Sequence, residues 1–272
     1  MPDVYAAITD ADVAMQERLA EVLELRAADP RQRAMLEEYT AQLDLADGSE
    51  LLEVGCGTGA VSRYLATLPG VAHVTGLDPS PLFVERAREL AGDAPVDFAV
   101  GDGRALELDD ERFDAVVFHT SLCHIPDVEL ALAEARRVLR PGGRLAAFDG
   151  DYATMTFARD AADPLQSCAA AVIEMVVFDP WLMRRIVPLV TAAGFTGAQV
   201  RGHAYTSAGR GTDYLLALVD RGADALAARG TIGAQLADAL KAEGRARMES
   251  GAFFGHIDYV SVNAQAAAAT GG

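Results

Sequence analysis

Three alternate glycines follow an apolar run that carries an acid. Residues 51–59 read Leu-Leu-Glu-Val-Gly-Cys-Gly-Thr-Gly, so Glu53 stands just before Gly55, Gly57 and Gly59. A strand that ends in such a loop must turn into a helix while its backbone touches a ligand, and a Cβ at these positions would collide with that ligand. The pattern predicts a nucleoside-binding loop whose surface is backbone.

The glycine loop alone does not select the nucleoside, because Gly55, Gly57 and Ala60 also satisfy the degenerate G-x-G-x-x-G/A pattern of dinucleotide sites. A second short strand is predicted to end in Asp78, at a spacing that suits a carboxylate accepting both ribose hydroxyls. A third apolar run ends in Gly-Asp-Gly at 101–103 and brings another acid to the same edge of the sheet. A dinucleotide site does not require that third acid.

Further segments complete an ordered set of motifs. Phe-Asp at 113–114, His-x-Pro-Asp at 124–127 and Leu-Arg-Pro-Gly-Gly at 139–143 follow the glycine loop in sequence. Together the motifs resemble class I S-adenosylmethionine-dependent methyltransferases, in the broad branch of ubiquinone, menaquinone and small-molecule (type 11) enzymes. The resemblance covers residues 33–150 closely and the remainder loosely. It implies an α/β fold: a doubly wound, mostly parallel, seven-stranded sheet with helices on its faces.

The same resemblance implies S-adenosyl-L-methionine as methyl donor and S-adenosyl-L-homocysteine as product. The glycine backbone would lie under the methionine part, Glu53 would orient the loop and the amino group, Asp78 would hold the ribose, and Asp102 would approach the adenine amino group. Alternatively, these acids are turn formers and caps at strand ends. The positions matched to cofactor contact are Glu53, Gly55, Cys56, Gly57, Gly59, Asp78, Pro79, Asp102, Gly103 and His119.

His119 is the candidate catalytic residue, since it stands at the predicted end of the fourth strand, near where the methyl group should point. A histidine has an ordinary pKa of about 6.5 and can take a hydroxyl proton during O-methylation. The alternative is a histidine that packs or hydrogen-bonds beside the cofactor. The sequence leaves oxygen, nitrogen and carbon acceptors open, because methyl transfer needs no side-chain base when the acceptor is already nucleophilic.

Five residues are candidates for the acceptor pocket. They lie after the fourth strand, just past the fifth strand and at a later helix start: His124, Asp149, Asp151, Tyr152 and Trp181. All of them except Tyr152 have a structural alternative. His124 would anchor the lid, the two aspartates would cap backbone amides where the chain leaves the sheet, and Trp181 would be a core anchor.

The coarse organisation is a helical cover, a methyltransferase domain and a tail. Residues 1–45 carry helical patterns at 10–27 and 31–44, separated by Asp-Pro at 29–30. The domain at 46–265 is predicted to carry helical lid insertions at about 152–178 and 208–250, and 266–272 are predicted to be flexible. Arg31 and Arg33 reach the cofactor carboxylate if the cover folds over the site, and are exposed helix charges otherwise.

Composition limits the partners. The chain has 272 residues, 51% of them apolar, and 40 acids against 23 bases give a formal net charge of −17. That balance argues against nucleic acid and favours a small-molecule acceptor. Three cysteines and five histidines show no metal-ligand spacing, so no metal is expected. No apolar run approaches about 18 residues and the first residues do not resemble a signal peptide, so a cytoplasmic protein without a membrane span is expected, and a homodimer is compatible with the sequence.

The sequence is also compatible with two other functions. One is a nicotinamide-dependent oxidoreductase that uses the same glycine loop, although the additional acids Glu53 and Asp102 argue against it. The other is a non-catalytic S-adenosylmethionine-binding module whose lid contacts a protein partner.

Overall fold

The apolar runs of the sequence form seven strands of one sheet in the computed structural model, which describes residues 3–209 and 213–267. The strand order is β3-β2-β1-β4-β5-β7-β6. The first five strands pair in parallel, and β7 is antiparallel to both of its neighbours. The predicted fold class is therefore confirmed. The strands are β1 Ser49–Val54, β2 Val71–Asp78, β3 Val96–Val100, β4 Phe113–His119, β5 Leu139–Thr156, β6 Phe195–Ala208 and β7 Phe254–Ala266.

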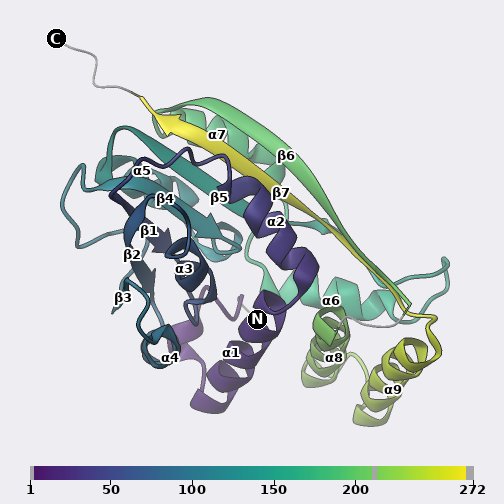
Figure 1. The fold of residues 1–272 in the computed structure, drawn as a ribbon. Coiled ribbons are helices and arrows are strands. Elements are labelled where there is room, and N and C mark those ends of the chain that lie inside the picture. Colours follow the sequence, from purple (N-terminus) through teal and green to yellow (C-terminus); the bar gives the residue numbers. More distant parts are fainter. Residues whose placement is uncertain (1–2, 210–212, 268–272) are drawn as a thin grey trace.

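The order of the parallel strands reverses between β1 and β4, which lie side by side at the centre of the sheet. In open α/β sheets a ligand binds at such a reversal, outside the carboxyl ends of the strands. The centre is buried on both faces, as the wholly apolar run of β4 at Ala115, Val116 and Val117 requires. Figure 1 shows helix α2 on one side of the sheet and α5 and α7 on the other.

Helices connect the strands and begin at recognisable caps. The crossover helices are α3 Ala60–Leu65, α4 Pro81–Ala91 and α5 Val128–Val138, and α7 Ile186–Ala192 precedes β6. At the start of α4, the Ser80 side chain accepts from Phe83 N at 3.1 Å, and Pro81 occupies the first helical position. This cap begins α4 directly after the acidic end of β2, which fixes the loop that lines the site.

Two helices form the N-terminal cover, after a short 3-10 turn at Ile8–Asp10. They are α1 Val13–Ala27 and α2 Pro30–Thr40. Asp29 caps α2 by accepting from Arg31 N at 2.8 Å, and Pro30 prevents continuation of α1. Helix α1 packs against α4 and α8, whereas α2 packs against β5, β6 and β7. The cover therefore bridges the nucleotide half of the sheet and the lid.

The lid consists of α6 Gln166–Val176, α8 Asp213–Ala228 and α9 Ala234–Ser250. Helix α8 packs between α6 and α9 and also touches α1, and Figure 1 shows α1, α8 and α9 in a row beneath the sheet. Short 3-10 turns lie at Leu122–His124 and Leu182–Arg185. Within the described ranges, no helix is both long enough and apolar enough to cross a bilayer.

Several boundaries differ from the sequence expectation. Strand β5 continues to Thr156, because its outer part pairs with β7, so Asp151 and Tyr152 lie in a strand and not at the start of a helical insertion. The helix expected to start near Trp181 is a 3-10 turn at Leu182–Arg185 followed by α7. Strand β7 runs to Ala266, and residues 268–272 of the predicted tail and 210–212 of the second insertion lie outside the described residues.

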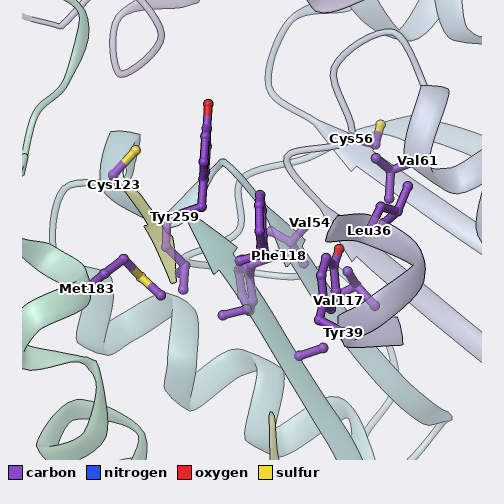
Figure 2. Packing of buried hydrophobic residues seen from close by; sticks show 14 of the residues in the cluster. Leu36, Tyr39, Val54, Cys56, Val61, Val117, Phe118, Cys123, Met183 and Tyr259 are labelled. Carbon is purple, nitrogen blue, oxygen red and sulfur yellow. The ribbon is translucent and has the colours of Figure 1, made fainter. Parts of the chain in front are cut away.

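A continuous core lies directly beneath the central strand ends. Figure 2 shows Leu36 and Tyr39 of α2 beside Val54 of β1 and Val117 and Phe118 of β4. All five side chains are buried. The cover helix α2 is thus part of the main core, and its position relative to the strand ends is fixed by packing.

Candidate functional site

A cavity of about 470 Å³ opens at the carboxyl ends of β1, β2 and β4. It is lined by nine of the ten residues matched to cofactor contact: Glu53, Gly55, Cys56, Gly57, Asp78, Pro79, Asp102, Gly103 and His119. Gly59 lies behind the loop, at the N-cap of α3, and does not line the cavity. The structure therefore gathers residues from four separate loops around one space.

Positive backbone angles and close packing explain the glycines of the loop. Gly57 has φ +52°, and a Cβ there would come within 2.8 Å of Leu23 Cδ1 from α1. Gly59 has φ +77°, and its Cβ would lie 2.5 Å from Phe98 Cζ. The expectation that ligand contact alone excludes side chains is therefore incomplete, because the surrounding protein also excludes them.

Asp78 ties the glycine loop to the end of β2. It accepts from Gly57 N at 2.8 Å with one carboxylate oxygen and from Ser80 N at 2.9 Å with the other. Burial raises the pKa of Asp78 to about 6, although both backbone hydrogen bonds act to lower it. Each oxygen keeps a second acceptor position, so the ionised carboxylate can still receive ribose hydroxyls.

Glu53 lies deeper, with only 1% of its surface exposed. The Ser62 hydroxyl of α3 donates to its carboxylate. The pKa of Glu53 is raised to about 8, chiefly by burial and also by the nearby Asp78, although the hydrogen bond from Ser62 acts to lower it. The carboxyl group is therefore protonated at neutral pH.

Asp102 and Gly103 form the edge of the cavity after β3. Arg104 pairs with Asp102 at 2.7 Å, and hydrogen bonding from Arg104 holds the pKa of Asp102 below its usual value. A Cβ on Gly103 would lie 2.6 Å from Val54 Cγ1, so a side chain there would displace the end of β1. Arg104 was not identified from the sequence, because an arginine two residues after an acid carries no motif.

His119 is buried at the end of β4. Its Nδ1 lies 2.9 Å from the Tyr39 hydroxyl, and its ring stacks on Phe148 with 4.9 Å between centroids. Burial, with a smaller contribution from Arg26, lowers the pKa of His119 well below its ordinary value. The ring is therefore neutral at neutral pH. Its Nε2 can accept a proton in the tautomer whose Nδ1–H donates to Tyr39.

Two of the five acceptor-pocket candidates, His124 and Tyr152, line the cavity. His124 Nδ1 lies 2.6 Å from Asp3 Oδ2, and its ring lies 4.8 Å from that of Tyr5. Asp3 also accepts from Phe178 N at 2.6 Å. His124 thus joins the N-terminal segment to the chain that follows α6, at the wall of the cavity.

The other three candidates, Asp149, Asp151 and Trp181, do not line this cavity. Asp149 accepts from Cys123 N at 3.0 Å and Gly150 N at 2.9 Å, which makes it a cap for backbone amides. Asp151 pairs with Arg184 at 2.7 Å. Trp181 is 52% exposed, and the Arg184 guanidinium lies 4.5 Å from its ring centroid on the outer surface.

Of the two arginines expected near the cofactor carboxylate, one lines the cavity and the other does not. Arg31 donates to the Thr206 carbonyl of β6 and does not line the cavity. Arg33 does line it, with its guanidinium 4.1 Å from the Tyr64 ring centroid and its Nε 2.8 Å from Glu37. Of the pair, only Arg33 keeps access to the site.

The cover helices contribute residues that sequence reasoning missed. Glu24 of α1 accepts from the Thr58 hydroxyl at 2.5 Å and pairs with Arg63 at 3.1 Å, so α1 is fastened to the glycine loop. Arg26 and Gln32 line the cavity from α1 and α2. The predicted N-terminal cover located these helices, but no pattern indicated which of their side chains face inward.

Comparison with known proteins gives a family match for the central part of the chain. Residues 52–147 match the family model of the methyltransferase domain. The chain is 37% identical over 151 residues to 27-O-demethylrifamycin SV methyltransferase of Amycolatopsis mediterranei, covering 54% of this chain and 48% of that one. The chain spans about half the length of the curated relatives it matches.

Solved structures share the fold at low identity. Geranyl diphosphate C-methyltransferase of Streptomyces coelicolor A3(2), solved with S-adenosyl-L-homocysteine, superposes with a TM-score of 0.52 at 18% identity, covering 86% of this chain and 79% of that one. The [4+2]-cyclase SpnF superposes with a TM-score of 0.54 at 21% identity, covering 87% and 82%. These similarities show a shared fold and not a shared reaction, since the same fold occurs in a cyclase.

Proposed function

We propose that the protein transfers the methyl group of S-adenosylmethionine to a small organic acceptor, because residues 52–147 match the methyltransferase-domain family and the strand order has the reversal at which such sheets bind a nucleoside. The observation that carries the proposal is Asp78, which joins the glycine loop to β2 and lines the cavity with its carboxylate. A nucleoside site needs such an acceptor of hydroxyl hydrogens beside a backbone cradle.

The residues present fit the cofactor. The glycine loop would hold the methionine part, Asp78 the ribose hydroxyls, and Asp102 and Gly103 the adenine. Arg33 would supply the positive charge for the carboxylate. Glu53 sits beneath the loop, and its hydrogen bond from Ser62 fixes the turn into α3. When bound, the cofactor supplies a methyl group on a positively charged sulfur.

Methyl transfer then requires positioning, because the acceptor atom must attack in line with the carbon–sulfur bond. The acceptor's lone pair forms the new bond to carbon, the old bonding pair stays on sulfur, and the acceptor releases any proton it carried. The cavity lies between the cover and the lid, which would hold the acceptor and exclude water. Neutral His119 would take the proton if the acceptor is a hydroxyl.

The second candidate function is a non-catalytic cofactor-binding module. The cyclase neighbour bears on it only in that this fold also occurs in a protein named for a reaction other than methyl transfer. Its fold matches this chain about as well as that of a named methyltransferase does. Binding of S-adenosylhomocysteine would agree with both functions, so turnover is the distinguishing measurement.

The test is transfer of an isotope-labelled methyl group from S-adenosylmethionine into a cell extract separated into small-molecule and macromolecular fractions. Asp78→Asn is the inactive comparison, and Asp97→Asn, at an 85% exposed side chain on β3, is the matched control. Label in the small fraction with wild type and Asp97→Asn, lost with Asp78→Asn, supports the proposal. Label in macromolecules contradicts the small acceptor, and bound cofactor without label favours the non-catalytic module.

A further inference from the structure

The cover and the lid bring positive charge to the cavity without a matching acid. Among the described residues that line the cavity, the acids are Glu53, Asp78 and Asp102, all at or just after the ends of strands. The helices contribute Arg26 of α1 and Arg221 of α8 in addition to Arg33 of α2. Arg26 acts to lower the pKa of Glu53, but that carboxyl is still protonated at neutral pH and does not neutralise the arginine.

Arg26 has no hydrogen bond or ion pair from its guanidinium within the described part of the chain. The other three arginines of the cavity each have a partner. Arg33 bonds Glu37, Arg104 bonds Asp102, and the Arg221 guanidinium lies 5.7 Å from the Tyr5 ring centroid. An arginine is always charged at neutral pH, and Arg26 is half-buried, so a counter-charge that enters the cavity would stabilise it. Arg26 is therefore placed to meet a group that enters the cavity.

Gln32 lines the same cavity. It is 3% exposed, and among the described residues neither its amide nitrogen nor its amide oxygen has a partner with normal hydrogen-bond geometry, although its amide acts to lower the pKa of the Tyr259 hydroxyl. A buried amide without partners costs about 1–3 kcal/mol. Native proteins rarely leave such a group unsatisfied, so a buried amide that faces a cavity points to a polar ligand.

Two tyrosines, Tyr5 and Tyr152, line the same cavity. Burial lowers the pKa of Arg26, whereas Tyr214, Tyr259, Tyr152 and Tyr5 raise it. The Tyr214 and Tyr259 hydroxyls lie 3.2 Å apart. The surroundings therefore offer hydrogen-bond donors from guanidinium, amide and phenol, which is the set that a carboxylate accepts.

Apolar side chains of the cover and the lid also line the cavity, among them Leu36 of α2, Val172 of α6 and Leu218 of α8. We propose that the methyl acceptor is an apolar molecule bearing a carboxylate, and that Arg26 and Gln32 bind that carboxylate. This inference rests on the proposed function. It selects anionic acceptors over protonated amines, because the cover and the lid contribute arginines and no described acid to the lining.

The test is direct binding by calorimetry to protein saturated with S-adenosylhomocysteine. The probes are three aromatic bodies, benzene, naphthalene and biphenyl, each carrying an acetate, an acetamide or an ethylamine group. For at least one body, the acetate should bind at least tenfold more tightly than its acetamide, and the amine more weakly still. Binding of no acetate, or of acetate and acetamide alike, by protein that still binds S-adenosylhomocysteine overturns the inference. Failure of S-adenosylhomocysteine itself to bind contradicts the proposed function instead.

Three variants separate recognition from folding. Arg26→Met should remove the acetate preference while the affinity for S-adenosylhomocysteine stays within twofold, and Arg18→Met, an exposed site on the same helix, should change neither. Gln32→Met should weaken acetate binding yet raise the melting temperature, because it removes an unsatisfied buried amide. A tenfold loss of S-adenosylhomocysteine affinity in Arg26→Met would assign Arg26 to the cofactor carboxylate and overturn the proposal.

Discussion

Replacing Glu53 by glutamine should change how the stability of the protein depends on pH. The Glu53 carboxyl is almost completely buried, and burial raises its pKa from an ordinary value of 4.5 to about 8. Between these two pH values the folded chain holds a proton that the unfolded chain has released. The stabilisation due to this proton is complete below pH 4.5 and is lost as the pH rises through about 8.

The magnitude follows from the shift. Each pH unit in this window corresponds to about 1.4 kcal/mol, so the free energy of unfolding of wild type should fall by about 5 kcal/mol relative to Glu53→Gln between pH 4.5 and 8. Glutamine keeps the size and can still accept from Ser62, but it does not titrate. The variant should therefore be the more stable protein at pH 9.

The assay is urea unfolding at five pH values from 5 to 9, without cofactor. Glu50→Gln is the matched control, because Glu50 lies on the same strand with a 38% exposed side chain beside Arg112. Its difference from wild type should stay nearly constant. A constant difference for Glu53→Gln as well would refute the reasoning, since it would mean that Glu53 is ionised in the folded protein at all these pH values.

Three further perturbations test the site. The affinity of wild type for S-adenosylhomocysteine should fall below pH 6 as Asp78 becomes protonated, whereas Asp78→Asn should bind weakly and without that dependence in calorimetry from pH 5 to 8. His119→Ala should lower kcat for a hydroxyl acceptor by a factor of about 10²–10⁴. Because the pKa of His119 is lowered, the acid limb of the wild-type kcat/KM profile should lie below pH 6.5. An unchanged kcat would show that His119 only packs beside the site. Gly59→Ala should destabilise the fold by about 1–3 kcal/mol in thermal unfolding, because φ is +77° and the new methyl meets Phe98, and unchanged stability would contradict this packing argument.

The fold could be predicted from the sequence because β1, β2 and β3 are short apolar runs that end at a glycine or an acid, and β4 is an apolar run that ends at a histidine. The second strand was expected to end at Asp78 and the fourth at His119, and β2 and β4 end at these residues. The outer part of β5 was not expected. Its residues Gly150, Asp151 and Thr156 pair with β7, about 100 positions later in the chain, and local patterns do not contain such long-range pairing.

Trp181 shows a second limit of the sequence. A large ring after Asp-Pro predicted either a pocket wall or a core anchor, yet the ring is half exposed and lies against Arg184. The burial of a side chain near a helix start depends on how that helix rotates against its neighbours. Here the chain forms a 3-10 turn at this point, which changes the periodicity that the expectation assumed.

Different features of the chain form the proposed cofactor part and the proposed acceptor part of the cavity. The cofactor part uses backbone amides and acids at the ends of adjacent parallel strands, so the topology alone brings Gly57 and Asp78 together. The acceptor part is made by side chains of α1, α2, α6 and α8, which meet through packing between elements far apart in sequence. The reaction class can therefore be inferred from motifs, whereas the acceptor depends on inward-facing side chains such as Arg26 and Gln32, which only the folded chain identifies.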